Sequence, residues 1–452
     1  MTAARAVVHG EAATAAADTS GQGRIDDIEL LRAVAIILVL IQHIPVDLFS
    51  WLPAFGGGPL YTYFGFWVGV DLFFAISGFV IARSLLPNLA AAESLTAHLN
   101  AAAAFWVRRA WRLLPSAWLW LAVILVASVL FNRSGAFESF RANFEGAVAG
   151  VLDVANFRAA MVFGRFELGS AGHYWSLSLE EQFYLLLPFV ILVSGRRLAL
   201  VAGAGVLLQL FVPRTGAEAG MLGSILNSVR TDAILLGVLI AIWSAHPTYS
   251  LFEPVFLKRR PAAGLMLFAG LVFLLAASGA LFLHIVPFQL GLVALMSALM
   301  VFIASYNKNY LWPPGRLKKI IMWFGTRSYA IYLVHVPAYL MTREIWYRLQ
   351  PPGTVFTDRF AIRFAYTAVI LVVVLAELNY RLVELPLRRR GARIAKRIAR
   401  RALPDSGMSP VEGIAPFQTF GPMSQSSRAH RDEGDLLPSG TQTGTATQVV
   451  PA

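Results

Sequence analysis

The first long apolar segment of the chain carries two ionisable residues, Arg32 and His43. They are eleven residues apart, so a helix would place them within roughly 20° of the same face and about 16 Å apart along its axis. A neutral imidazole can remove the proton of a hydroxyl group, and a guanidinium can hold a phosphate or a carbonyl oxygen. One stripe of the helix therefore holds both residues, where they could have a chemical function. A snorkelling Arg with a His at the lipid headgroups would explain the same two residues.

A basic cluster follows in the segment FWVRRAWRLLP, with Arg108, Arg109 and Arg112. Arg108 and Arg112 are spaced i, i+4 and would share one side of a helix. Three guanidinium groups suit a polyanionic phosphate ligand. Binding lipid headgroups is the more ordinary use of such a cluster in a membrane protein.

The segment HYWSLSLEEQFYLLLP contains two adjacent acids, Glu180 and Glu181. Ser178 and Glu181 match the S-x-x-E capping box, which predicts a helix start at Ser178 and explains Glu181 without chemistry. Glu180 is four residues before Tyr184, so the two side chains share a helix face. We place both at the membrane level where His43 should lie.

Other polar residues interrupt apolar segments. In GVDLFFAISGFVIA, Ser77 and Gly78 precede Phe79 and favour close helix packing, whereas Asp71 is equally consistent with a partner on another span and with a function. Glu377 and Arg381 are spaced to neutralise each other. The remaining isolated polar residues are Arg230, Asp232, Arg327, Ser328, Tyr329, His335 and Glu384.

The composition predicts that these residues are positioned by membrane-spanning helices. Apolar residues make up 57% of the chain, charged residues 14%, and mean hydropathy is +0.61, far from a soluble domain. Apolar runs of about 20 residues match a bilayer core of roughly 30 Å. They predict an all-α bundle of ten spans, near residues 28–49, 61–82, 113–131, 176–194, 198–213, 222–243, 263–283, 286–305, 320–341 and 362–385.

The distribution of Lys and Arg predicts the orientation of the bundle. With a cytoplasmic N-terminus, inner loops hold about 21 of these residues and outer loops about 8, so the positive-inside rule puts both termini in the cytoplasm. Because the net charge of +12 lies mostly between spans, it does not indicate nucleic-acid binding. Residues 145–163 contain Asp153 and Arg158, and we interpret them as an outer loop or interfacial helix.

The Cys and His content of the chain argues against several kinds of site, and the composition of the chain ends predicts its domain organisation. The absence of Cys excludes disulfides and thiolate sites, and no His spacing indicates a metal. We expect a disordered tail over residues 1–24, a membrane domain over 25–388, and a basic juxtamembrane segment followed by a disordered tail over 389–452. Without an apolar signal-peptide core before residue 24, the first span is expected to be an uncleaved anchor.

Seven motifs occur in a recognisable order: Arg32 with ten residues before His43, GVDLFFAISGF, RRAWR, HYWSLSLEEQFY, RTDAILLG, SYAIYLVH and VELPLR. Together they resemble acyltransferase family 3, a family of membrane-bound O-acyltransferases, over about residues 25–388. The resemblance implies transfer of an acyl group, most often acetyl, from cytoplasmic acyl-CoA to a sugar hydroxyl of a surface polysaccharide, glycolipid or related acceptor. It also implies a bacterial cytoplasmic membrane and no permanently bound cofactor.

The resemblance implies roles for the residues above. Arg108, Arg109 and Arg112 would hold the CoA phosphates, Arg32 would hold the CoA or a carbonyl group, and His43 would deprotonate the acceptor. Glu180 is the candidate to orient His43 or the acceptor, through a contact that the sequence leaves open. Some members of the family carry a C-terminal SGNH esterase-like domain, and the tail after Arg401 is too short for one, so we expect a standalone form.

A different class of function stays open at this level. Buried charges also line transport paths, so a membrane carrier or flippase that moves a glycolipid or small solute without covalent chemistry is the alternative. No internal repeat of transporter type is visible in the sequence, which disfavours a secondary carrier.

Overall fold

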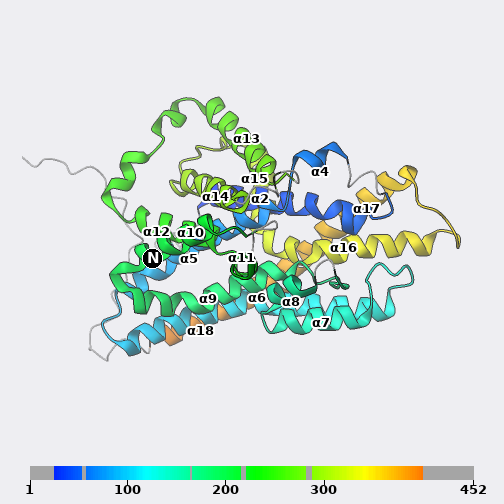
Figure 1. Ribbon diagram of the computed structural model, residues 1–452, viewed down its shortest axis with the longest axis horizontal. Helices are drawn as coiled ribbons and strands as arrows, with labels where there is room; N and C mark the ends of the chain where they lie inside the picture. The colour runs from blue at the N-terminus through cyan, green and yellow to red at the C-terminus, as the bar shows by residue number, and fades with distance from the viewer. Residues whose placement is uncertain are drawn as a thin grey trace, which may run out of the picture. The chain divides into compact units, whose positions relative to one another are not determined.

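The computed structural model describes residues 25–52, 58–162, 165–214, 220–280, 283 and 288–400. These residues belong to one compact unit, Arg24–Gly407, and they form helices and no strands (Figure 1). The predicted tails over 1–24 and after Arg401 lie outside the described residues. The longer helices are α2 (Asp26–His43), α5 (Val68–Ala90), α6 (Leu95–Leu130), α7 (Phe140–Val151), α9 (Tyr174–Ser194), α10 (Leu198–Phe211), α12 (Asp232–Ser244), α13 (Pro261–Ser278), α14 (Gln289–Ser305), α15 (Arg316–Thr326), α16 (Ser328–Leu349), α17 (Ala361–Asn379) and α18 (Leu385–Arg400).

Shorter elements join these helices. They are the π-helical turns η1 (Ile44–Leu48) and η7 (Tyr380–Glu384), the helices α4 (Pro59–Tyr63), α8 (Ala155–Val162) and α11 (Gly220–Ser228), and the 3-10 turns η2 (Gly195–Arg197), η3 (Pro247–Phe252), η4 (Val255–Arg259) and η6 (Asp358–Phe360).

Six helical segments of the described chain are long and apolar enough to cross a membrane. The predicted all-α class is therefore confirmed, while the count of ten spans and the cytoplasmic position of both termini stay predictions. The described part of the stretch 145–163, residues 145–162, falls on the short helices α7 and α8 and their connection, and neither helix is among the six segments.

Several predicted spans differ from the structure, and three of them are informative. α6 begins at Leu95, well before the predicted start at 113, because the Ala-rich stretch ahead of the Arg cluster favours helix. The predicted spans 222–243 and 320–341 are each broken, with Arg230 and Arg327 at the breaks. Charged side chains at these positions lie between helices, where they reach partners on other elements.

The closest helix packing occurs between α5 and α12. A Cβ atom added at Gly78 would lie 1.9 Å from the carbonyl oxygen of Ile234, and one at Gly237 would lie 2.2 Å from that of Ala75. At each of the two positions, the backbone of the other helix occupies the space that a Cβ atom would need. No residue larger than glycine therefore allows the helices to approach this closely. The packing role predicted for Gly78 is confirmed.

Two buried ion pairs accompany this packing. Arg230 donates to both carboxylate oxygens of Asp71, at 2.6 and 2.5 Å, and Arg214 donates to Asp232 at 2.5 Å. Asp71 thus has its partner on the segment that precedes α12. This agrees with the interpretation of Asp71 as a residue that pairs with another part of the bundle. Glu377 contacts Arg381, as predicted, and also Arg327.

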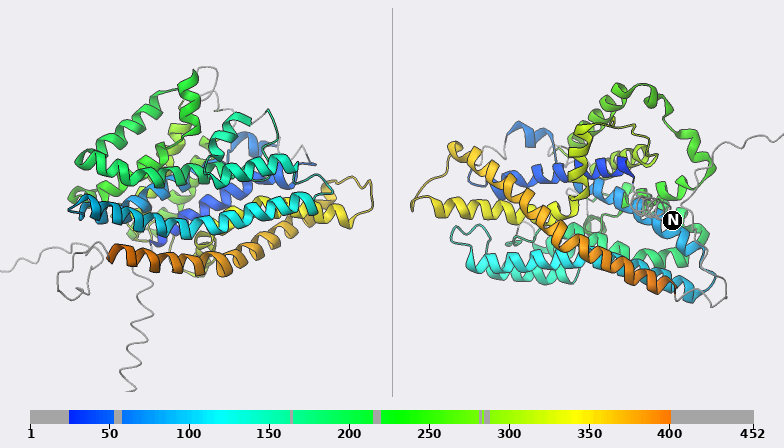
Figure 2. Two further views of the ribbon diagram at one scale, coloured as in Figure 1. Left: turned by 90° about the horizontal axis from the view of Figure 1, so that it is seen from below. Right: turned by 180° about the vertical axis from the view of Figure 1, so that it is seen from behind.

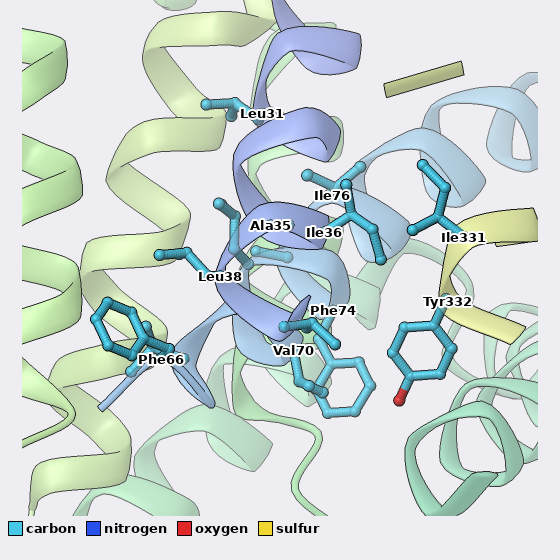
Figure 3. Packing of buried hydrophobic residues seen from close by; sticks show 14 of the residues in the cluster. Leu31, Ala35, Ile36, Leu38, Phe66, Val70, Phe74, Ile76, Ile331 and Tyr332 are labelled. Carbon is cyan, nitrogen blue, oxygen red and sulfur yellow. The ribbon is translucent and has the colours of Figure 1, made fainter. Parts of the chain in front are cut away.

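Helix α2 lies in the centre of the apolar core, against α5, α14, α15 and α16. Figure 3 shows this core, in which Leu31, Ala35, Ile36 and Leu38 of α2 lie near Val70, Phe74, Ile76, Ile331 and Tyr332. The same packing holds Arg32 and His43 between neighbouring helices. At the other end of the chain, α18 lies along α6 (Figure 2), so the predicted domain limit at residue 388 falls inside a helix.

Candidate active site

One cavity collects eight of the residues singled out in the sequence. It has a volume of about 80 Å³, several times the ~15 Å³ that holds a water molecule. Side chains from α2, α5, α6, α9 and α16 line it, and Val70, Phe74, Ile76 and Tyr332 of Figure 3 belong to its wall. Its polar lining consists of Arg32, Ser77, Arg109, Arg112, Ser176, Glu180, Tyr184, Ser328, Tyr329 and Tyr332.

A hydrogen-bonded network crosses the cavity from α9 to α5. The Tyr184 hydroxyl donates to Glu180 at 2.7 Å and also contacts the hydroxyl of Ser77. The guanidinium of Arg109 lies over the Tyr184 ring, 4.8 Å from its centre. The predicted proximity of Glu180 and Tyr184 is confirmed. Ser77, for which the sequence favours helix packing, faces the cavity instead, while its neighbour Gly78 contacts α12.

The cavity carries an excess of positive charge. Arg32 forms an ion pair with Glu29 at 2.7 Å, whereas Arg109 and Arg112 have no ion pair within the described part of the chain. The Nε atom of Arg112 is buried without a hydrogen-bond partner. An unpaired buried guanidinium is costly, and an anionic ligand would relieve that cost.

Arg108 lies apart from the other two arginines of the cluster. It is exposed and does not line the cavity, although the i, i+4 spacing grouped it with Arg112. The cavity faces the i, i+3 pair Arg109 and Arg112, because α6 is one continuous helix through this region and turns Arg108 away.

The predicted capping box at Ser178 is wrong. α9 begins at Tyr174, so Ser178 lies inside the helix, and its hydroxyl accepts a hydrogen bond from the backbone N–H of Ala155 at 3.2 Å. Glu181 lies on the wall of a second, smaller cavity together with Asp153, Ser178 and Glu180.

Asp153 occupies the short connection between α7 and α8 with a left-handed backbone (φ 54°), and burial raises the pKa of its carboxyl to about 6. Because this pKa exceeds the unfolded value of about 3.9, the resulting stabilisation of the folded protein is complete below about pH 4 and is lost as the pH rises through 6.

We predict that Asp153→Asn raises the melting temperature above pH 6 and leaves it unchanged near pH 4. Asn tolerates the same backbone. Thermal unfolding in detergent across this range measures the effect, and a pH-independent difference would contradict it.

His43 lies outside the cavity lining, in a cluster of three imidazoles. Its ring centre is 4.8 Å from that of His335, which is 5.2 Å from that of His173. Tyr332 joins the cluster to the cavity, since it lines the cavity and its hydroxyl donates to the His173 carbonyl at 2.8 Å. Tyr332 thus belongs both to the cavity wall and to the surroundings of the imidazole cluster.

His43 and Glu180 do not contact each other in the structure. The sequence had left this contact open. His43 Nδ1 instead lies 2.7 Å from Asp47, and Glu180 is engaged with Tyr184. Asp47 follows His43 by one helical turn and reaches the ring first. The sequence interpretation missed Asp47, and the i, i+4 spacing in HIPVD is the signal that could have found it.

The other two imidazoles are buried with unused nitrogen atoms. His335 Nδ1 donates to the carbonyl of Tyr332 at 2.7 Å, so its Nε2 carries the lone pair and has no hydrogen-bond partner. Both ring nitrogens of His173 are likewise buried without one. His173 and Tyr332 were also missed as site residues, although both belong to quoted motifs.

Several motif residues lie away from the cavity and serve packing. Asp71, Arg230 and Asp232 belong to the ion pairs beside α12. Phe79 is fully buried in the apolar core, next to Gly78 at the contact of α5 with α12. The described geometry therefore separates a structural group at the contact of α5 with α12 from a chemical group that lines the cavity from α2, α5, α6, α9 and α16.

Comparison with known proteins gives a consistent picture. A family model described as "Acyltransferase domain" matches residues 25–377. The peptidoglycan O-acetyltransferase OatA of Listeria monocytogenes is 30% identical over 394 residues, which cover 81% of this chain and 56% of that protein. The putative peptidoglycan O-acetyltransferase YrhL of Bacillus subtilis is 30% identical, with 82% and 56% covered. The O-acetyltransferase OatA of Staphylococcus aureus is 25% identical, with 80% and 57% covered. The chain thus spans little more than half the length of these relatives. No solved structure matches it.

Proposed function

Since this chain belongs to the acyltransferase family whose model covers residues 25–377, we propose that it is a membrane O-acyltransferase that uses acyl-CoA. The acyl group is acetyl, and the acceptor is a sugar hydroxyl of a cell-surface polysaccharide. The names of the relatives favour peptidoglycan as that polysaccharide. The bacterial cytoplasmic membrane is the proposed location.

The observation that carries this proposal is the cationic cavity beside the imidazole cluster. Arg109 and Arg112 supply guanidinium groups that lack ion pairs within the described chain, and Arg32 extends the positive charge along α2. Bidentate guanidinium groups suit the phosphates of acyl-CoA. His43 lies further along the same helix, in the imidazole cluster, where a hydroxyl acceptor would meet the acyl group.

The chemical step follows from these positions. His43 Nε2 removes the proton of the acceptor hydroxyl, and the oxygen attacks the thioester carbonyl carbon. The new C–O ester bond forms and the C–S bond breaks. The thiolate of CoA leaves and receives the proton that His43 had taken. Arg32 is positioned to hold CoA or the carbonyl oxygen while charge develops.

Membranes that contain the protein provide a direct test with radiolabelled acetyl-CoA. We expect alkali-labile label to appear on the extracted cell-wall glycan, and not with membranes that lack the protein. A carrier or flippase would instead move its solute across vesicles without placing covalent label on any glycan. That result would overturn the proposal.

The two kinds of arginine on α6 give a matched pair of variants. We predict that Arg109→Ala raises the apparent KM for acyl-CoA by about tenfold or more, because it removes a charge-assisted contact to phosphate, while turnover at saturation changes less. Arg108→Ala should leave KM near the wild-type value, since Arg108 is exposed outside the cavity. Steady-state kinetics with labelled acetyl-CoA measure both. Equal effects of the two substitutions would argue that the cluster serves lipid headgroups.

A further inference from the structure

The turn that follows α2 brings a carboxylate to the His43 ring. His43 is the last residue of α2, and Pro45 lies at the start of the π-helical turn Ile44–Leu48. Within this turn the Oδ2 atom of Asp47 comes to 2.7 Å from His43 Nδ1. Both side chains are part-buried, with 29% of His43 and 18% of Asp47 exposed.

This contact decides which nitrogen of His43 carries the lone pair. An ionised carboxylate only accepts hydrogen bonds, so Nδ1 carries the hydrogen and donates it. In the neutral ring the lone pair then lies on Nε2, which has no hydrogen-bond partner in the described part of the chain. A base whose lone pair points away from its carboxylate is ready to take a proton from a substrate.

A second contact limits rotation of the ring. The His335 ring lies edge-on to His43, with an interplanar angle of 75°, and His335 is itself held by the carbonyl of Tyr332. The imidazole of His43 is therefore fixed by Asp47 at one nitrogen and by His335 at the ring.

The remaining charged groups near Asp47 do not compete for this role. Arg343 on α16 and Glu138 on the α6–α7 connection both interact electrostatically with Asp47. Neither forms an ion pair with it among the described residues, and Glu138 accepts a hydrogen bond from the Gly169 N–H at 2.8 Å. Within the described part of the chain, the contact with His43 is the only hydrogen bond or ion pair of the Asp47 carboxylate.

We infer that Asp47 is the positioning residue of the transfer reaction, which holds His43 in the tautomer with a free Nε2 and faces the imidazolium once it forms. This inference rests on the proposed function. When Nε2 takes the acceptor proton, the ring gains one positive charge beside the carboxylate. The proton then passes from Nε2 to the departing thiolate, and the ring returns to its neutral form. Asp47 stays ionised throughout and makes no bond to substrate.

Asp47→Asn tests the inference in the full-length protein, in membranes. An amide can present its NH₂ group to Nδ1 and so select the opposite tautomer. We expect kcat to fall by about 10²- to 10⁴-fold, with an apparent KM for acetyl-CoA close to that of the wild type. Asp47→Glu keeps the charge and should retain more activity than Asp47→Asn. Glu138→Gln is the matched control, because it removes a nearby charge without touching His43, and it should stay within about threefold of the wild type.

The double variant of His43→Ala with Asp47→Asn separates positioning from independent damage. If Asp47 acts through His43, the double variant is about as inactive as His43→Ala alone. Wild-type kcat in Asp47→Asn would overturn the inference while leaving the proposed function standing. If Asp47→Asn and Glu138→Gln lose equal amounts of kcat, Asp47 has a merely structural role. The same conclusion would follow if Asp47→Glu and Asp47→Asn lose equal amounts of kcat and both have a lowered melting temperature. A wild-type protein without transfer activity would instead overturn the proposed function.

Discussion

His43→Ala is expected to abolish acyl transfer, with a loss of about 10²- to 10⁴-fold or more in turnover. The imidazole is the base of the proposed step, and alanine at this position leaves the acceptor hydroxyl without a proton acceptor. Folding should be little affected, because the His43 ring is part-exposed at the end of α2 and its hydrogen bond with Asp47 joins it to the adjacent turn.

The comparison variant for this prediction is His246→Ala. His246 is an exposed histidine in the connection that follows α12, and its ring forms hydrogen bonds with its neighbour Thr248. Label transfer from acetyl-CoA to glycan should be lost in His43→Ala and preserved in His246→Ala, at equal amounts of protein in the membrane. Substantial transfer by His43→Ala would remove His43 from the mechanism.

The largest loss of stability is expected for Asp71→Ala. This substitution leaves the Arg230 guanidinium buried without its carboxylate, between the rings of Trp67 and Trp175 at 5.0 and 5.8 Å. Breaking one side of a buried ion pair costs about 3–5 kcal/mol. The loss should also disturb the close contact of α5 with α12, and it appears as a lower melting temperature and less protein in the membrane.

Two further variants separate the buried charge from other causes. Asp71→Ala combined with Arg230→Met removes both charges and should recover part of the stability, because no charge is then left uncompensated. Arg141→Ala breaks the exposed pair of Arg141 with Glu145, in which the arginine is 89% exposed, and should leave the melting temperature close to that of the wild type. If Asp71→Ala is as mild as Arg141→Ala, the buried pair does not hold the helices together.

The sequence was informative wherever a property depends on one helix alone. Apolar length located α2, α9 and α10 closely, and helical spacing paired Glu180 with Tyr184. It was less reliable where charged residues interrupt apolar runs. At Arg230 and Arg327 the chain leaves the helix, and hydropathy averaged over a window does not register such a break.

Within the candidate site, the sequence by itself determined the kinds of chemical group present and their order along each helix: guanidinium groups in Arg32, Arg109 and Arg112, an acid in Glu180 and a base in His43. The tertiary structure alone decided that Arg108 lies outside the cavity, that Asp47 and not Glu180 meets His43, and that His43 belongs to an imidazole cluster outside the cavity lining. The physical reason is that spacing along a chain gives the direction of a side chain around its own helix axis. The distance to a group on another helix depends on how closely the helices pack, and contacts such as Gly78 with Ile234 set that distance.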